Sequence, residues 1–261
     1  MRIFVILDYE KSSLTKGTFD FVDVRDDGIY NLTTPSGERH RLLLVDFHFE
    51  LLYEIGAHAL LDGYYRETVT SFAAALERFY ESFTEFYFVL RGPNSFNWTV
   101  FWKHIRNQSE RQLGAFCAAY SSLFDDPIPL LKEENAKFRN EVVHKGRIPS
   151  REEAIDFGEI VGSLIVTSMR KIFSSYEEEF GKFQHNRVQT LDKEGSSAKA
   201  DRYLVGSTSS VIGLVYRNQW PNPWTLKSQL KAVKYLRALR IVNCDYPRAI
   251  KDLNETKLNA G

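Results

Sequence analysis

The stretch that decides the fold is residues 65–90, YRETVTSFAAALERFYESFTEFYFVL. Its large apolar residues recur at alternating spacings of four and three: Tyr65, Val69, Phe72, Leu76, Phe79, Phe83, Phe86 and Leu90. This spacing places them on one face of an α-helix, as in a helix that packs lengthwise against another helix. Because the spacing is regular, it favours the core of a bundle or a dimer over a surface that stacks nucleic-acid bases.

Further helices are expected on the C-terminal side of this stretch. One runs from residue 98 to about 123, where Asp125-Asp126-Pro127 stops it, and the next runs from about Pro129 to Lys145. Gly146 closes that helix, since glycine takes the left-handed conformation most easily. Ser150 and Glu153 have the form of a capping box that starts a helix running to about residue 180. Residues 46–180 are therefore predicted to form an all-α bundle.

The two ends of the chain have a different character. Residues 1–45 contain short apolar runs between turn signals, at 2–7, 19–25, 29–33 and 41–45, and predict a β-rich appendage. Residues 181–261 predict a basic extension that begins with a polar linker at 181–200. Strands are expected at 203–205 and 211–216, followed by a helix from Asn222-Pro223 to about 241. The predicted fold is mainly α, with a small N-terminal β appendage and a C-terminal α/β extension.

Composition excludes several classes of protein. The 261 residues are 43% hydrophobic and 14% aromatic, enough for a substantial core. The apolar run from Ile3 to Leu7 is too short for a signal peptide or a membrane span, so a soluble cytoplasmic protein with no membrane contact is expected. The two cysteines, Cys117 and Cys244, form no CxxC pair or Cys/His cluster. No metal and no cofactor is therefore expected.

Charge is distributed unevenly along a chain whose formal net charge is zero. Residues 1–181 hold 20 Lys and Arg against 28 Asp and Glu, a net of −8, whereas residues 182–261 hold 14 against 6, a net of +8. Two interpretations remain open. The basic tail binds a polyanion, or it docks on the acidic body of its own chain or of a neighbour.

The residues most suited to chemistry lie at the end of the helix that Gly146 closes. Asn140 and His144 are one turn apart on the same face, and the long Arg139 side chain can reach the groove beside them. Histidine titrates near neutrality, and a guanidinium binds phosphate. These groups suit RNA cleavage by the ribose 2′-hydroxyl, with His144 moving a proton and Arg139 stabilising charge on the phosphoryl oxygens.

This part of the chain resembles the HEPN superfamily of prokaryotic toxins, antiviral effectors and nucleases. The resemblance covers residues 46–180 and is carried by Arg-Asn-x-x-x-His at 139–144. Its most specific parts are FRNEVVHKG at 138–146 and IPSREEA at 148–154, with the helix opening DGYYRE at 62–67 upstream. Some family toxins carry a tyrosine just beyond the histidine that a partner antitoxin modifies. Lys145 and Gly146 stand there in this chain.

The resemblance implies a helical bundle that dimerises so that two copies of the motif meet in one groove. It implies a metal-independent endoribonuclease that leaves a cyclic phosphate, and it assigns catalytic roles to Arg139 and His144 and an auxiliary polar role to Asn140. The implied setting is the effector of an antiviral defence or toxin–antitoxin system, with RNA as substrate and an antitoxin or sensor protein as a further partner. Lys145 and Arg147, beside the motif, are expected to contact RNA.

A second candidate for RNA contact is the basic helix near the C-terminus. Lys227, Lys231 and Lys234 recur about one turn apart, close to Trp220 and Trp224, an arrangement that can hold phosphates and stack a base. The alternative is a solvated face above an apolar one.

Other interpretations of the motif also remain. His144 is a candidate helix cap or buried histidine, and Arg139 a candidate for a surface salt bridge. Glu77 either approaches the motif as a supporting carboxylate or, as we expect, is an exposed helix charge. At the level of the whole chain, the alternatives are a non-catalytic module that binds RNA, a nucleotide or a protein, and a structural subunit of a defence complex. GxSxG, GxxxxGK[ST] and HExxH motifs are absent.

Overall fold

The chain folds into two compact units. The structure is a computed structural model that describes residues 2–6, 19–33, 37–92, 97–194, 202–206, 210–217 and 224–241. One unit comprises residues 1–45, 186–209 and 228–261, and the other comprises residues 46–185 and 210–227. We predicted three consecutive segments, at 1–45, 46–180 and 181–261. The division into units differs from this prediction, because the last part of the chain is shared between both units.

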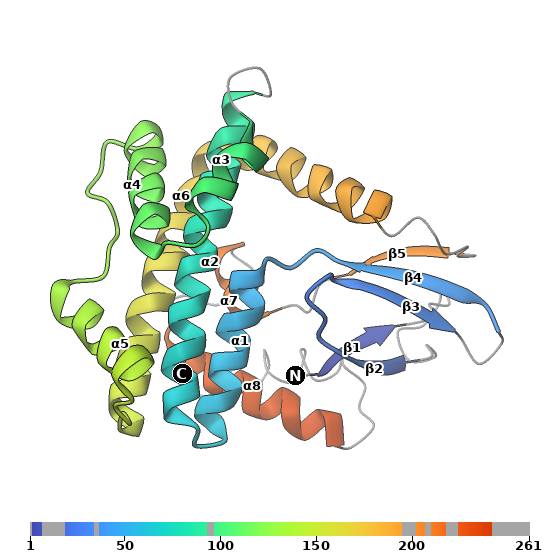
Figure 1. Cartoon of the computed structure of the whole chain (residues 1–261). Coiled ribbons are helices and arrows are strands. Elements are labelled where there is room, and N and C mark those ends of the chain that lie inside the picture. The colour runs from blue at the N-terminus through green and yellow to red at the C-terminus, as the bar shows by residue number, and fades with distance from the viewer. Residues whose placement is uncertain are drawn as a thin grey trace. The chain divides into compact units, whose positions relative to one another are not determined.

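The first unit contains two small sheets, labelled in Figure 1. In one, the strands β1 (Arg2–Ile6) and β2 (Phe19–Asp23) pair antiparallel. In the other, β4 (Arg39–Leu44) lies between an antiparallel β3 (Ile29–Thr33) and a parallel β5 (Arg202–Gly206). The short N-terminal strands and the strand near residue 203 are thus confirmed.

The second unit is helical. Its helices are α1 (His48–Leu61), α2 (Tyr65–Arg91), α3 (Trp98–Ile105), α4 (Ser109–Leu123), α5 (Glu133–Lys145), α6 (Arg151–Glu194) and α7 (Val211–Tyr216), of which α6 runs on past the unit. The helix α8 (Leu226–Ile241) belongs to this unit only at residues 226–227 and otherwise to the first unit. The helix α2 lies beside α1 and also contacts α4 and α5 (Figure 1). A mainly helical fold is therefore confirmed.

The apolar stripe of α2 forms the centre of this unit. Six of its predicted positions are buried: Val69, Phe72, Leu76, Phe79, Phe83 and Phe86. The Phe79 ring meets Phe116 of α4 edge-on at 5.7 Å, and the Phe83 ring stacks on Tyr120 at 5.7 Å. These aromatic residues are therefore bundle core.

Three expected elements differ from the structure. The helix predicted for 98–123 is two helices, α3 and α4, separated at Arg106–Gln108, where the Gln112 amide donates to the Arg106 carbonyl at 2.7 Å. The predicted linker after residue 180 is helical as far as Glu194, beyond a kink at Tyr176. Residues 211–216, predicted as a strand, form the helix α7.

A buried carboxylate joins α7 to α1. Glu50 Oε1 accepts from the Tyr216 hydroxyl at 2.6 Å and from Arg217 Nη1 at 3.0 Å, while Oε2 accepts from the Phe47 backbone N–H at 2.7 Å. Burial raises the pKa of Glu50. A Cβ at Gly213 would meet Glu50 Oε1, so only glycine allows α7 to approach this closely.

No helix in the described part of the chain combines the length and the apolar character needed to cross a bilayer.

Candidate functional site

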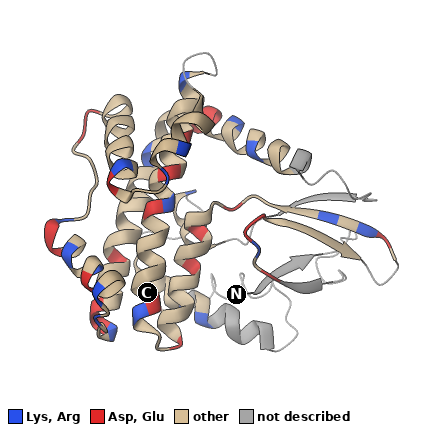
Figure 2. Ribbon diagram, viewed as in Figure 1, with Lys and Arg blue, Asp and Glu red and all other residues tan. Residues whose placement is uncertain are grey.

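The helix α5 ends as its sequence predicts. Gly146 adopts a left-handed conformation, with φ 74° and ψ 17°, and its N–H donates to the Glu141 carbonyl. At the other end, Glu133 and Glu134 occupy the first turn, where carboxylates are favoured by the helix dipole. The helix begins at Glu133 and not near Pro129. The ribbon colours of Figure 2 show acidic and basic residues interspersed along it.

A capping box starts the next helix, α6. The Ser150 backbone N–H donates to Glu153 Oε2 at 2.7 Å, and the Glu153 N–H donates to Ser150 Oγ at 3.1 Å. The hydrogen bond from the Ser150 backbone lowers the pKa of Glu153. The predicted capping box is therefore confirmed, and it fixes where the chain turns after the motif.

Arg147 ties the two helices together across this turn. Its guanidinium donates to Glu141 Oε2 of α5 at 2.5 Å and to Glu153 Oε1 of α6 at 2.5 Å. It also lies over the Phe138 ring, with 5.0 Å between the guanidinium carbon and the ring centroid. Arg147, which we expected to contact RNA, is thus engaged by two carboxylates.

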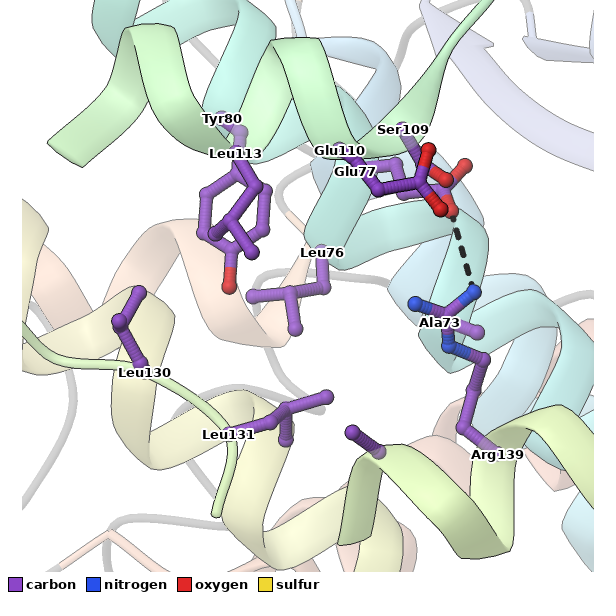
Figure 3. Close-up of a pocket in the computed structure, with 11 residues that line it drawn as sticks. Ala73, Leu76, Glu77, Tyr80, Ser109, Glu110, Leu113, Leu130, Leu131 and Arg139 are labelled. Carbon is purple, nitrogen blue, oxygen red and sulfur yellow. Dashed lines mark ion pairs between the residues drawn. The ribbon is translucent and has the colours of Figure 1, made fainter. Parts of the chain in front are cut away.

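Arg139 points from α5 toward α2. Its Nη1 lies 3.7 Å from Glu77 Oε1, and the side chain is 22% exposed (Figure 3). The expectation that Glu77 is merely an exposed charge is therefore wrong, and the supporting carboxylate that we considered as the alternative is what the structure contains. At 3.7 Å the contact is an ion pair without a hydrogen bond.

Asn140 and His144, the other two motif residues, are exposed. Of the three, only Arg139 lines the adjacent pocket. Among the residues that the structure describes, neither Asn140 nor His144 makes a side-chain hydrogen bond or ion pair. A single chain thus presents the amide and the imidazole to solvent, at the end of the helix that holds Arg139.

The pocket beside Arg139 lies between α2, α4, α5 and the segment before α5, and its volume is about 140 Å³. Its apolar lining comprises Ala73, Leu76, Leu113, Leu130, Leu131 and Ala136. Its polar lining comprises Glu77, Tyr80, Ser109, Glu110 and Arg139. Figure 3 shows the Tyr80 hydroxyl directed into the pocket, while the carboxylates of Glu77 and Glu110 lie on the side of the Arg139 guanidinium.

Sequence reasoning missed Tyr80, Ser109 and Glu110. Tyr80 follows Glu77 by three residues, so it lies on the same face of α2, and this spacing was a usable signal. Burial raises the pKa of the Tyr80 phenol, which keeps its hydroxyl protonated at neutral pH. Ser109 and Glu110 come from the start of α4, and no local pattern links them to Arg139.

The remaining residues that we predicted to contact RNA are exposed. This holds for Lys145 at the end of α5 and for Lys227, Lys231 and Lys234 on α8. Trp224 is buried, with its ring centroid 6.4 Å from that of Tyr53, so its indole belongs to the core. Trp220 lies outside the described residues.

No group of three or more His, Cys, Asp or Glu within the described ranges is placed to hold a metal ion. Comparisons of the chain with family models, with curated proteins and with solved structures found no match.

Proposed function

We propose that this protein is a metal-independent endoribonuclease of the HEPN type that acts as a homodimer. The observation that carries the proposal is the arrangement at the end of α5. Arg139 is held at a pocket, whereas Asn140 and His144 are presented to solvent directly before a left-handed glycine. The capping box that follows fixes the next helix, so the motif has a defined position on the bundle.

The reaction needs one proton acceptor and one cation. The ribose 2′-oxygen attacks the neighbouring phosphorus and gives up its proton, the bond from phosphorus to the 5′-oxygen breaks, and this 5′-oxygen takes up a proton. The products are a 2′,3′-cyclic phosphate and a 5′-hydroxyl. In our proposal His144 moves the proton and Arg139 stabilises the phosphoryl oxygens.

A second copy of the chain completes the site in this proposal. The exposed motif has an apolar neighbour, Ile148, whose side chain is 82% exposed. Covering an exposed apolar side chain with a partner removes its surface from water, which is favourable in free energy. A dimer on this face brings two His144 imidazoles and two Arg139 side chains to one groove.

The proposed substrate is RNA, and the exposed lysines Lys145, Lys227, Lys231 and Lys234 supply phosphate contacts. Arg147 joins them only if RNA displaces one of its two carboxylates. The proposed setting, taken from the family resemblance, is a cytoplasmic effector of prokaryotic defence or of a toxin–antitoxin pair. An antitoxin or sensor protein would then control it.

The test is incubation of the purified protein with mixed RNA in EDTA, beside His144→Ala. Cleavage by the wild type and not by His144→Ala is expected, with 2′,3′-cyclic phosphate ends. The matched control is His104→Ala, which removes an exposed histidine from α3 and should cleave normally. Equal cleavage by wild type and His144→Ala contradicts the mechanism, and a monomeric mass by light scattering contradicts the shared groove.

A second candidate is a non-catalytic module that binds RNA, a nucleotide or a protein partner. It is favoured by the ion pair between Arg139 and Glu77, which occupies the cation that the reaction requires. RNA binding without cleavage by the wild type would support this candidate over the nuclease.

A further inference from the structure

The pocket beside Arg139 has the dimensions of one aromatic ring. Its volume is about 140 Å³, and an apolar protein cavity of about 150 Å³ holds one benzene molecule. Leucine and alanine side chains from α2, α4, α5 and the segment before α5 supply its apolar walls. Aliphatic walls of this kind suit the faces of a flat ring, so the lining favours a planar occupant.

The polar groups of the pocket determine which hydrogen-bonding groups a ring bound there must carry. Two carboxylates, Glu77 and Glu110, line it with one guanidinium, Arg139, so these three side chains carry a net formal charge of −1. Carboxylates accept and never donate when ionised, and they therefore select a ring that carries N–H donors.

The Tyr80 hydroxyl supplies the complementary group. It points into the pocket in Figure 3, from the side opposite the carboxylates. A tyrosine hydroxyl is protonated at neutral pH, so it can donate a hydrogen bond to an occupant. The carboxylates need a hydrogen-bond donor, and the Tyr80 hydroxyl needs an acceptor. A ring with an amino group at one position and an oxygen or nitrogen acceptor at another supplies both.

Resting on the ribonuclease proposed above, we propose that this pocket binds one unstacked cytosine base of the RNA substrate. The exocyclic amino group of cytosine is the donor for the carboxylates, a pairing already typical of Glu and cytosine in nucleic-acid recognition. The O2 and N3 acceptors face Tyr80. The phosphate attached to this nucleoside then lies outside the pocket, and its contact with Arg139 requires the guanidinium to leave Glu77.

Other bases fit less well. Uracil has the size of cytosine but presents an oxygen where cytosine presents the amino group, and this oxygen would face the carboxylates. Adenine and guanine are fused rings, so an open pocket of about 140 Å³ encloses a smaller part of them than of cytosine. The pocket therefore predicts preference for cytosine over uracil through charge.

Binding is tested first, with short 2′-O-methyl oligonucleotides, which lack the nucleophile and are not cleaved. One oligonucleotide contains uridine alone. In the other, one of these uridines is replaced by a cytidine. Calorimetry of the full chain is expected to show at least about fivefold tighter binding with the cytidine, the low end for one base-specific contact. Cytidine monophosphate and inorganic phosphate are tested as free probes. Equal affinity for the two oligonucleotides overturns the proposal, even if cytidine monophosphate binds, because the ligand is then a free nucleotide.

Two variants localise the preference. Ala136→Leu fills the pocket from a half-buried position of α5, and Glu110→Gln replaces one carboxylate with an amide of the same shape. Both are expected to abolish the preference for cytidine. The control Glu134→Gln removes the same charge from an exposed site on α5 that does not line the pocket, and it should keep the preference. Retention of the preference in both pocket variants overturns the proposal.

Cleavage mapping separates this proposal from the proposed function. Cuts clustered beside cytidines in wild type and dispersed in Ala136→Leu support both. Cuts without regard to base leave the ribonuclease standing and overturn the cytosine pocket. A cytidine preference in the binding experiment without cleavage by any form supports the pocket and rejects the nuclease.

Discussion

The Arg139 guanidinium of α5 and the Glu77 carboxylate of α2 form an ion pair at 3.7 Å, on the side of the pocket that also holds Glu110. The separation is too long for a hydrogen bond, and both side chains are partly exposed. Such a pair stabilises little, so it holds the guanidinium in place without preventing its transfer to a phosphate.

Glu77→Gln is therefore expected to strengthen RNA binding. The carboxylate competes with phosphate for Arg139, and removing a partly exposed competitor worth up to about 1 kcal/mol tightens binding up to about fivefold. The measurement is the Kd for the 2′-O-methyl oligonucleotide that contains uridine alone, at fixed salt, because Glu77 also accepts from cytosine in the proposed pocket.

The matched control is Glu81→Gln, which removes the same charge from the same helix but from a pair with Arg78. An equal gain in both variants would mean that net charge, and not release of Arg139, is responsible.

Tyr216→Phe is expected to destabilise the helical unit more than Tyr53→Phe. Both phenols are buried, but Tyr216 donates to the Glu50 carboxylate at 2.6 Å, whereas Tyr53 donates to the neutral Gly158 carbonyl at 2.7 Å. A hydrogen bond to a charged group contributes about 1.5–3 kcal/mol and a neutral one about 0.5–1.5 kcal/mol. Urea denaturation of the two variants gives the comparison, and equal losses would contradict a charge-assisted hydrogen bond between Tyr216 and Glu50.

Gly162→Ala and Gly181→Ala, both in α6, are expected to change stability in opposite directions. A Cβ at Gly162 would meet the Trp224 ring and the Tyr53 hydroxyl, whereas one at Gly181 would meet nothing within 4 Å. Overpacking costs about 1–3 kcal/mol, while alanine replaces glycine in an open helix position with a gain of roughly 0.5–1 kcal/mol. Denaturation curves of the two variants give the comparison. A Gly162→Ala variant more stable than wild type would show that the Trp224 ring can move aside.

The capping box predicts a pH dependence at Glu153. Its pKa is lowered from an ordinary 4.5, so its carboxylate adds stability that is present above 4.5 and is lost as pH falls through the lower folded value. Glu153→Gln should therefore be less stable than wild type at neutral pH, and the difference should vanish in acid. Denaturation across this range is the measurement.

Glu152→Gln is the control for that experiment. Glu152 is the exposed neighbour in the same first turn, and no ion pair of its carboxylate exists among the described residues. A pH-dependent loss of the same size there would assign the effect to the helix dipole and not to the capping box.

The helices with strong local signals were predictable, and the ambiguous segments were not. The stripe from Val69 to Phe86 predicts α2 because one face of a long helix must be buried. Residues 211–216 are a short apolar run with β-branched residues, and such a run does not distinguish a strand from a helix. The usable signal was Ser210, whose hydroxyl accepts from the Gly213 N–H at 3.2 Å and caps α7.

The candidate site was predictable only along one helix at a time. Spacing places Asn140 and His144 on one face of α5, and it places Glu77 and Tyr80 on one face of α2. Which of these faces meet depends on how the helices pack. Glu110 reaches the pocket because the break between α3 and α4 sets where α4 begins, and that break was not apparent from residues 98–123.

The parallel pairing of β4 with β5 sets an order for biosynthesis. The register joins His40 to Arg202 and Leu44 to Gly206, so the three-stranded sheet waits until the ribosome has made more than 200 residues. Contacts so distant in sequence form slowly, because a long loop must close first. Residues 46–185, which are continuous and carry the motif, emerge from the ribosome earlier. The nascent chain therefore displays a complete Arg139–His144 helix while the other unit still lacks a strand.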